Sequence, residues 1–352
     1  MTYTVTVRPS SREFAADKGE TILEAALRQH VTLPYGCRDG ACGSCKGRVL
    51  QGRFEQGPHQ ARALTEAEAK DGYALFCCSR PLEDLEIESR EVLGADEFPV
   101  RKLAVRIHSI EPAADDVVVL RLQLPANQRL QYRAGQFLEL ILRDGTRRSY
   151  SMATAPDAEA DQIELHVRHL PGGRFTDALF GRSEPAIKVR DILRMEAPLG
   201  TFFLREDTDK PILLLASGTG YAPIKAIIEH AIARGLARPM KLYWGCRSAA
   251  DLYHHAEALA LVERAAAAGV SLDYVPVLSD PREQDHWTGR IGFVHRVVMH
   301  DIGDLSGWQV YACGAPIMVD SAHGDFVSQC GLPADEFFAD AFTSEADKVQ
   351  PA

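Results

Sequence analysis

The sequence predicts a multidomain protein: a small α+β domain, then an antiparallel β-barrel, then an α/β Rossmann-like domain. At 352 residues the chain is too long for a single domain of ordinary size. Strand-like runs follow one another between residues 102 and 168, a succession typical of an antiparallel barrel. From residue 211 strands alternate with helices, which predicts a parallel sheet covered by helices on both faces.

Residues 1–92 are predicted to form the first domain, which contains one helix among several strands. Thr21 and Glu24 have the spacing of a capping box, in which each side chain accepts a free backbone N–H at the start of a helix. Mostly apolar residues then recur at helical spacing as far as Gln29. We expect strands around this helix at residues 2–7, 11–16, 46–50 and 83–88.

The cysteines of this first domain are spaced as ligands of an iron–sulfur cluster. Three of them form a C-x4-C-x2-C pattern and a fourth follows across a longer gap: Cys37, Cys42, Cys45 and Cys77. This spacing is typical of a plant-type [2Fe–2S] cluster held by four thiolates. A zinc site would pair C-x2-C with a second C-x2-C or with histidines, and neither lies near these segments. Inert cysteines are the other alternative.

The segment Tyr35–Cys45, together with Phe76, Cys77 and Pro81, resembles the plant-type ferredoxin family. The resemblance implies that the first domain has the small β-grasp fold. In that family the fourth ligand lies four residues before a proline. Cys77, rather than its neighbour Cys78, is therefore expected to bind iron.

Two polar segments of the second domain point to a flavin. Arg147–Ala153, here called the flavin stretch, ends a strand, and Pro171–Thr176, the glycine turn, opens a short helix. Together they resemble the R-x-Y-S and G-G-x-x-[S/T] signatures of the ferredoxin–NADP reductase family. A core tyrosine at a polar strand end is the alternative for the first segment alone. The resemblance implies FAD, with FMN as the alternative, bound by Arg148, Ser149, Tyr150, Ser151, His166, Val167, Gly172, Gly173, Arg174 and Thr176.

The third domain opens with an apolar strand that leads through Gly218, Thr219 and Gly220, here called the dinucleotide turn, into a helix. The bare G-x-G is weak evidence, because any tight strand-to-helix turn can contain it, and Pro223 stands where the dinucleotide fingerprint has its third glycine. The whole string nevertheless resembles the G-T-G-x-A-P motif of the same reductase family, which implies a nicotinamide dinucleotide at this turn.

Two later segments resemble other parts of that dinucleotide-binding domain. Arg247 and Asp251 match the segment near the adenosine ribose, where an acid favours NADH and an arginine favours NADPH. We expect NADH. Cys313, Gly314 and Pro316 match a C-G-x-P-x-M motif whose cysteine lies near the reacting nicotinamide carbon, although a buried strand-end cysteine is the alternative. The catalytic residues that the resemblance implies are Tyr150, Ser151 and Cys313.

Composition limits the class of partner. The net charge of −10 argues against nucleic acid. No apolar run approaches the length of a membrane span, and no signal peptide is visible. Eight cysteines, four of them assigned to a cluster, indicate a reducing compartment, and we expect the cytoplasm. His254 and His255 are expected to lie on a solvated helix face.

The three motifs together predict a ferredoxin domain at 1–92, an FAD-binding barrel at 99–205 and an NAD(P)-binding domain at 206–352, with a linker near 91–101. The resemblance implies a reductase that passes electrons from NADH through FAD and [2Fe–2S] to a partner protein. The chain resembles both the CDP-6-deoxy-Δ3,4-glucoseen reductases, which serve a sugar dehydratase, and the reductase components of oxygenases of the phenol hydroxylase type. A non-catalytic redox sensor or carrier and a free-standing flavin or quinone reductase are the alternatives.

Overall fold

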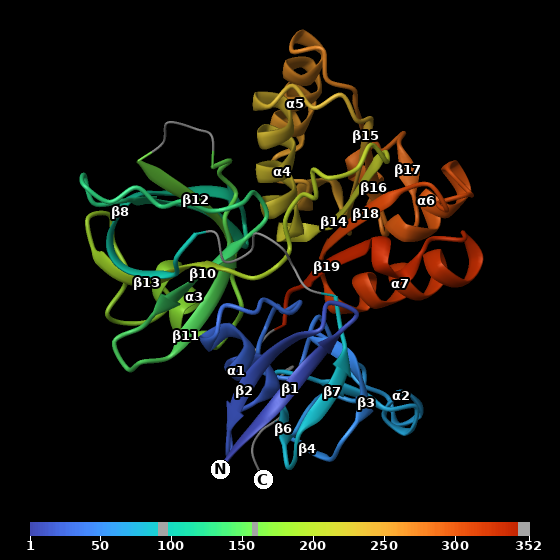
Figure 1. Ribbon diagram of the computed structural model, residues 1–352. Helices are drawn as coiled ribbons and strands as arrows, with labels where there is room; N and C mark the ends of the chain where they lie inside the picture. Colours follow the sequence, from blue (N-terminus) through green and yellow to red (C-terminus); the bar gives the residue numbers. More distant parts are fainter. Residues whose placement is uncertain (91–97, 157–160, 344–352) are drawn as a thin grey trace. The chain divides into compact units, whose positions relative to one another are not determined.

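The computed structural model describes residues 1–90, 98–156 and 161–343, and in this part of the chain three large sheets follow one another (Figure 1). They belong to two compact units, one formed mainly by Met1–Pro99 and the other by Val100–Ala339. The barrel sheet and the α/β sheet therefore share one unit. Most of the linker expected near residues 91–101 lies outside the described residues.

The first unit is built on a five-stranded sheet with the order β2-β1-β7-β3-β5. Its central pair, β1 and β7, is parallel, whereas β1–β2, β3–β7 and β3–β5 are antiparallel. The predicted capping box is present, because Glu24 N–H donates to Thr21 Oγ1 and Thr21 N–H donates to the Glu24 carboxylate. The elements are β1 (Thr2–Arg8), β2 (Arg12–Asp17), α1 (Ile22–Arg28), β3 (Lys46–Gln51), β4 (Phe54–Gln56), α2 (Glu66–Lys70), β5 (Tyr73–Leu75), β6 (Ser79–Pro81) and β7 (Leu85–Glu88).

The second sheet has six antiparallel strands in the order β11-β10-β13-β8-β9-β12. Ala153 N–H, just past β11, donates to Glu164 O on β12 at 2.8 Å, which brings the two edge strands together as a barrel requires. The predicted antiparallel barrel is confirmed. Its elements are β8 (Arg101–Ala114), β9 (Val117–Gln123), β10 (Phe137–Ile141), β11 (Arg147–Ser151), β12 (Gln162–Arg168), α3 (Arg174–Leu179) and β13 (Ile192–Leu199).

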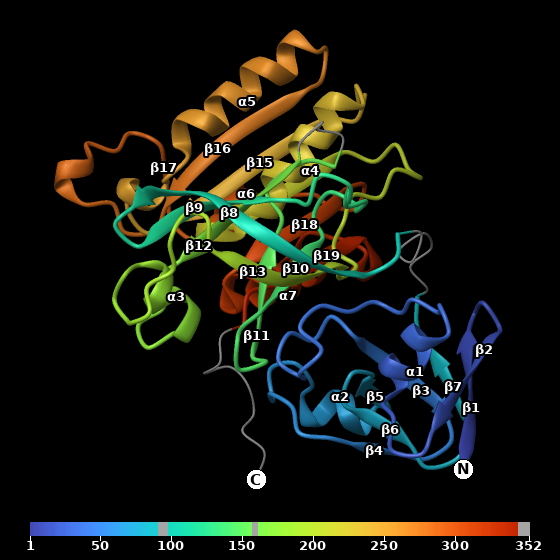
Figure 2. The same cartoon turned by 90° about the vertical axis from the view of Figure 1, so that its left-hand side faces the viewer.

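The third sheet has the order β17-β16-β15-β14-β18-β19, and the pairs from β17 to β18 are parallel. Helices α4 and α5 pack side by side on one face and α6 and α7 on the other (Figures 1 and 2). The predicted α/β domain is confirmed. Its elements are β14 (Ile212–Ser217), α4 (Tyr221–Ala233), β15 (Met240–Cys246), α5 (His255–Ala267), β16 (Leu272–Leu278), β17 (Arg290–Ile291), α6 (Val294–Asp301), β18 (Gln309–Gly314), α7 (Pro316–Gln329) and β19 (Phe337–Ala341).

The order of strands in this third sheet creates a switch point. The chain runs from β14 to β15 on one side, and later returns to place β18 on the other side of β14. In open parallel sheets, ligands bind at the carboxyl ends of strands beside such a point. At the carboxyl end of β14 lies the dinucleotide turn, and at the carboxyl end of β18 lies the Cys313–Pro316 segment, which continues into α7. Within the described residues, no helix has the length and apolar character needed to cross a membrane.

Candidate cofactor sites

The cluster loop, Cys37–Cys45, brings its first two cysteines face to face. The N–H of Cys37 donates to the Cys42 sulfur at 3.4 Å, and the N–H of Cys42 donates to the Cys37 sulfur at 3.3 Å. A hydrogen bond from the Cys37 thiol lowers the pKa of Cys42 to about 6, although burial opposes the shift. Backbone amides that point at sulfur are the groups that stabilise cluster thiolates.

The other two cysteines are brought together by strand pairing. Lys46 on β3 lies opposite Leu75 on β5, so this register places Cys45 opposite Phe76, the residue before Cys77. The Cys45 and Cys77 thiols are close enough to share a hydrogen bond. Phe76 N–H donates to Cys45 O at 3.1 Å, which ties the two segments together. Both cysteines are buried, and the proximity of Cys45 raises the pKa of Cys77.

This arrangement of two thiol pairs fits a two-iron cluster. Among the described residues, no group of three or more His, Cys, Asp or Glu side chains is arranged to hold a single metal ion. Four cysteines in two pairs supply two thiolates to each of two irons. The loop also depends on glycine. A Cβ on Gly36 would lie 3.3 Å from the Cys42 sulfur, and one on Gly40, where φ is +78°, would lie 2.8 Å from the Cys78 sulfur.

The flavin stretch and the glycine turn, separate in sequence, meet in the barrel. The Tyr150 ring on β11 packs against the Phe175 ring on α3 with centroids 5.5 Å apart. Arg174, the first residue of α3, forms an ion pair with Asp144 in the turn between β10 and β11. The structure therefore brings together the two segments that are predicted to bind one cofactor.

Neighbouring arginines in the flavin stretch have different surroundings. Arg147 bridges Glu139 on β10 at 2.6 Å and Glu196 on β13 at 2.8 Å, so it holds three strands together. Arg148 donates one guanidinium N–H to the backbone oxygen of Arg147 and is half-buried. Ser149 is exposed, Tyr150 is half-buried and Ser151 is buried. Arg147 is thus committed to carboxylates of the barrel, and the binding of a phosphate group by Arg148 stays a prediction.

The remaining predicted flavin residues divide into turn and strand positions. Gly172 has φ +80° and open space where a Cβ would lie. Thr176 is buried and donates its hydroxyl to Leu170 O at 3.0 Å, so it closes the turn around Gly173. Val167 packs in the barrel core, so any contact of this residue with a cofactor must come from its backbone.

The dinucleotide turn interlocks with the loop after β18. A Cβ on Gly220 would lie 2.2 Å from Cys313 O, and a Cβ on Gly314 would lie 2.3 Å from Ser217 Oγ. Ala315 N–H donates to the same Ser217 oxygen at 2.9 Å. Gly220 and Gly314 are therefore required to be glycine for the two loops to approach. The predicted residues around Cys313, which is fully buried, lie at the same edge of the sheet as the turn.

Three further side chains surround the dinucleotide turn. Trp244 on β15 donates its indole N–H to Gly218 O at 3.0 Å and stacks on Tyr221 with centroids 4.2 Å apart. The guanidinium of Arg168 on β12 lies 3.6 Å from where a Gly218 Cβ would be. Arg168 Nη2 and the Tyr221 hydroxyl are buried, and neither has a hydrogen-bond partner among the described residues. Two buried donors beside a glycine turn fit a phosphate-bearing dinucleotide.

The segment predicted to lie near the ribose forms a separate turn. One Asp251 carboxylate oxygen accepts from Ser248 N–H at 2.9 Å and from Ser248 Oγ at 2.8 Å, which closes a 3-10 turn at Ala249–Asp251. Arg247, just before that turn, is exposed. Pro223 is buried as the third residue of α4, and Pro316 is the first residue of α7, positions where proline costs no helical hydrogen bond.

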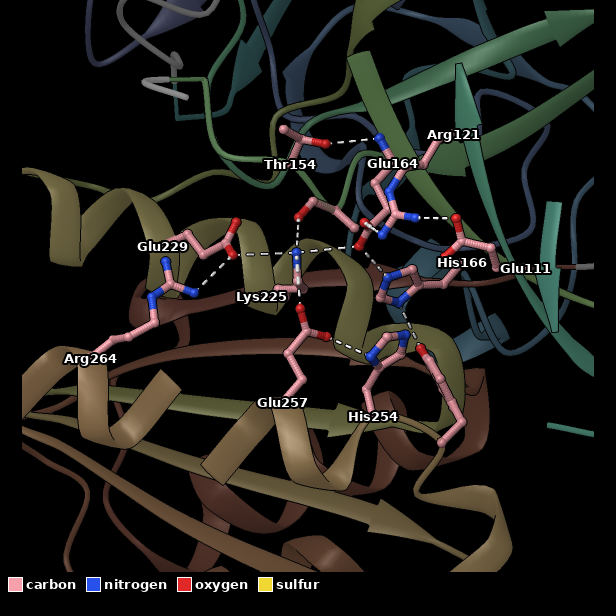
Figure 3. Close-up of polar contacts among 12 residues, drawn as sticks. Glu111, Arg121, Thr154, Glu164, His166, Lys225, Glu229, His254, Glu257 and Arg264 are labelled. Atoms are coloured by element: carbon pink, nitrogen blue, oxygen red, sulfur yellow. Dashed lines mark hydrogen bonds and ion pairs between the residues drawn. The ribbon is translucent and has the colours of Figure 1, made fainter. Parts of the chain in front are cut away.

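The prediction of a solvated helix face for His254 and His255 is wrong, since His255 Nδ1 lies 3.0 Å from Tyr274 Oη and His254 precedes α5. His254 stacks on His166 of the barrel, with ring centroids 5.0 Å apart, and its Nδ1 lies 2.6 Å from the Glu257 carboxylate (Figure 3). His166 is itself buried, with Tyr253 Oη at 2.8 Å and Glu164 at 2.9 Å. Burial lowers the pKa of His166, against the opposing effect of Glu164.

Comparison with known proteins gives three family matches in the expected order. A 2Fe-2S iron-sulfur cluster binding domain matches residues 5–82, an oxidoreductase FAD-binding domain matches 104–204, and an oxidoreductase NAD-binding domain matches 214–324. Each match contains the corresponding motif residues described above, and residues 205–213 separate the FAD-binding match from the NAD-binding match.

Several relatives match this chain over nearly their whole length. The CDP-6-deoxy-L-threo-D-glycero-4-hexulose-3-dehydrase reductase of Yersinia pseudotuberculosis is 38% identical over 97% of this chain and 99% of its own. The reductase component of phenol 2-monooxygenase from Pseudomonas sp. strain CF600 is 33% identical over 99% of this chain and 96% of its own. The crystal structure of a cytochrome P450 reductase from Amycolatopsis matches with a TM-score of 0.75 and 34% identity, covering 97% of this chain and 99% of that one.

Proposed function

The chain belongs to the iron–sulfur flavoprotein reductases, in which cluster, FAD-binding and NAD-binding domains follow one another. We propose which of its residues bind the cofactors that carry electrons from NADH to a partner protein. The electrons pass from NADH to FAD, then to the [2Fe–2S] cluster, and then to the partner. The observation that best supports our assignment is that one compact unit contains both sites. In this unit the two flavin segments contact each other, and the dinucleotide turn interlocks with the Cys313–Pro316 segment.

Bound FAD supplies the central chemistry, because it exchanges two electrons with NADH and single electrons with the cluster. The protein's own residues position these groups. We propose that Arg148 binds the flavin phosphates, that Tyr150 packs on the flavin ring, and that Ser151 lies beside its reacting edge. Cys313, fully buried at the carboxyl end of β18, faces the nicotinamide in this proposal.

Two residues outside the predicted set extend the dinucleotide site. We propose that Arg168 Nη2 and the Tyr221 hydroxyl donate to the phosphates of NADH, because both atoms are buried beside the dinucleotide turn without a hydrogen-bond partner among the described residues. Arg168 Nε, in contrast, lies 3.4 Å from the Asp116 carboxylate, which holds the guanidinium in place. Asp251 keeps one carboxylate oxygen that is not committed to Ser248, and we propose that this oxygen accepts from a ribose hydroxyl. Such a contact favours NADH, since a 2′-phosphate would be repelled by the carboxylate.

For the partner, we propose a dehydratase that acts on a nucleotide-linked deoxysugar. The support is the 38% identity with the dehydrase reductase of Yersinia pseudotuberculosis over nearly the whole chain. An oxygenase component is the second candidate, supported by the 33% identity with the phenol 2-monooxygenase reductase. We also propose a reducing, cytoplasmic location, because none of the eight cysteines forms a disulfide.

Electron transfer through the cluster is tested with Cys42→Ser. Ferricyanide accepts electrons from reduced flavin directly, whereas cytochrome c requires the cluster, so the variant should lose cytochrome c reduction and keep NADH-to-ferricyanide turnover. Cys330→Ser, the same substitution at a cysteine that ends α7 in the other unit, serves as the matched control. Cytochrome c reduction that survives Cys42→Ser unchanged would show that electrons leave the protein by another path.

A further inference from the structure

We propose that Lys225 is a positioning residue that holds the flavin stretch at a set distance from the dinucleotide turn. This inference rests on the proposed function for the location of the two cofactors. Lys225 lies on α4, two residues after Pro223, and only about 5% of it is exposed. A buried lysine in an otherwise apolar helix segment requires partners for its charge, and its partners come from both halves of the unit.

The Lys225 ammonium is the centre of a charge cluster, here called the Lys225 network (Figure 3). It lies 3.3 Å from Glu164 on barrel strand β12, 3.3 Å from Glu229 on α4 and 3.6 Å from Glu257 on α5. It also donates to Ala153 O, 3.4 Å away. Of these four partners, Glu164 and Ala153 belong to the barrel.

The excess of carboxylates around Lys225 is balanced at the edges of the network. Arg121 lies 2.9 Å from Glu164, Arg264 lies 3.5 Å from Glu229, and His254 lies 2.6 Å from Glu257. Each carboxylate therefore has a second cationic or hydrogen-bonding partner besides Lys225. Buried ion networks of this kind contribute little net stability, because desolvation offsets the attraction, but they allow few alternative geometries.

The network reaches both proposed cofactor sites through short pieces of chain. Ala153, whose backbone oxygen accepts from Lys225, is two residues past Ser151 at the proposed flavin edge. Lys225 itself lies five residues past Gly220 of the dinucleotide turn, and the helix turn between them is buried. A shift of the ammonium relative to Ala153 would therefore alter the separation of flavin and nicotinamide.

Strand β12 shows why the contact has a defined register. Alternate residues of a strand point to the same side. Three alternate residues of β12 each contact a different element of the α/β half: Glu164 contacts Lys225 on α4, His166 contacts Tyr253 before α5, and Arg168 lies against Gly218. Among the described residues at this contact between β12 and the α/β half, only Lys225 forms ion pairs with carboxylates of β12, α4 and α5 together.

Positioning matters because transfer between two bound groups requires the reacting atoms to lie about 3–3.5 Å apart, and a displacement of roughly 1 Å can cost about 100-fold in rate. Lys225→Met keeps the length of the side chain and removes the charge that gathers the three carboxylates. We expect it to slow flavin reduction by NADH about 10- to 100-fold. The dissociation constant for NADH should change far less, since Lys225 contacts no group that we assign to NADH.

The test uses the full-length protein loaded with FAD and cluster. Stopped-flow absorbance at several NADH concentrations gives the limiting rate of flavin reduction and the dissociation constant separately. A second readout is the long-wavelength charge-transfer absorbance of the reduced protein with NAD⁺, which depends on how flavin and nicotinamide stack. Lys241→Met is the matched control. Lys241 on β15 pairs at 2.6 Å with Asp273 on β16, so this ion pair lies wholly within the α/β sheet.

The inference is supported if Lys225→Met binds FAD, loses the charge-transfer absorbance and lowers the limiting rate, while Lys241→Met behaves as the wild type. A limiting rate and an absorbance band within twofold of the wild type would overturn it. If Lys225→Met does not fold, Glu164→Gln decides, since it weakens only the barrel side of the network: a lowered limiting rate supports the inference and a wild-type rate overturns it. Failure of the proposed function is distinct, because the wild-type flavin would then not be reduced by NADH.

Discussion

Gly220 shows at the scale of one residue how closely the dinucleotide turn is built. A Cβ at this position would overlap the Cys313 carbonyl oxygen at 2.2 Å and the Cys313 carbonyl carbon at 2.5 Å. Both atoms belong to the backbone of a buried strand, so they cannot move aside as a flexible side chain would. The missing side chain is therefore what lets β14 and β18 present their loops to one ligand.

Gly220→Ala should raise the KM for NADH at least about 10-fold and destabilise the protein by about 1–3 kcal/mol, as overpacking in a filled core does. Steady-state ferricyanide reduction and thermal unfolding measure the two effects. Gly324→Ala is the control, because Gly324 lies in α7 with open space at its Cβ position and alanine is the better helix former. A Gly220→Ala protein with a wild-type KM would contradict the close approach.

The adjacent thiols Cys77 and Cys78 give a matched pair for the cluster. Their sulfurs lie 3.5 Å apart, but Cys77 is the one beside Cys45, while Cys78 packs against Gly40. Cys78→Ser should therefore keep the iron and sulfide content and the visible spectrum of the wild type. Cys77→Ser should lose most of both, because a serine oxygen replaces a thiolate ligand. The opposite result, with Cys78→Ser losing the cluster, would transfer the ligand assignment to Cys78.

At the scale of elements, β12 is the strand that joins the barrel to the α/β half of its unit. Burial alone would raise the pKa of Glu164, but the hydrogen bond with His166 and the charges of Lys225 and Arg121 outweigh it and lower the pKa. Burial lowers the pKa of His166 as well. Both groups bind fewer protons in the folded state than in the unfolded chain, so both stabilise the fold more as pH rises.

The stability that Glu164 contributes should be present above the ordinary pKa of a glutamate and lost as pH falls below it. Glu164→Gln should therefore be less stable than the wild type at pH 7, by about 1–3 kcal/mol, with a lower unfolding temperature. It should also lose less stability than the wild type between about pH 5 and pH 3, where the Glu164 carboxylate of the unfolded chain takes up its proton. Release of flavin fluorescence on heating follows this unit. Glu111→Gln, which removes an exposed partner of Arg121, is the control. Equal losses for Glu164→Gln and the wild type would contradict the assignment.

Elements with a strong local signal were predicted well. The capping box at Thr21 and Glu24, the apolar run of β14 and the strand β12 were found where their patterns placed them. Strand β13 was not predicted as a strand, because Pro198 near its end argues against one, yet it lies between β10 and β8. Helix α5 begins only at His255, because Asp251 closes a separate turn before it.

The candidate site was predictable only where residue order carries the signal. The cysteine spacing and the glycine motifs are local patterns, so Cys37–Cys45 and Gly218–Gly220 could be proposed from sequence alone. Lys225, Arg168 and His254 could not, since their partners lie far away along the chain and meet them only in the folded unit. One signal was present: the alternation of Glu164, His166 and Arg168 is unusual polarity for one side of a barrel strand.

At the scale of the whole molecule, the order of the domains matches the order of electron transfer in reverse. NADH delivers two electrons together, whereas a [2Fe–2S] cluster accepts one at a time, so a flavin between them is required. The flavin and dinucleotide segments share one compact unit, while the four cysteines belong to the other. One chain therefore contains the complete route from a two-electron donor to a one-electron acceptor.

The most direct test of this route is an anaerobic titration of the purified protein with NADH, followed by visible absorbance and low-temperature EPR. We expect the flavin absorbance to bleach and a rhombic signal of a reduced [2Fe–2S] cluster to develop as NADH is added. Bleaching of the flavin without that signal would contradict the route, because it would show that electrons from NADH stop at the flavin and do not reach the four cysteines.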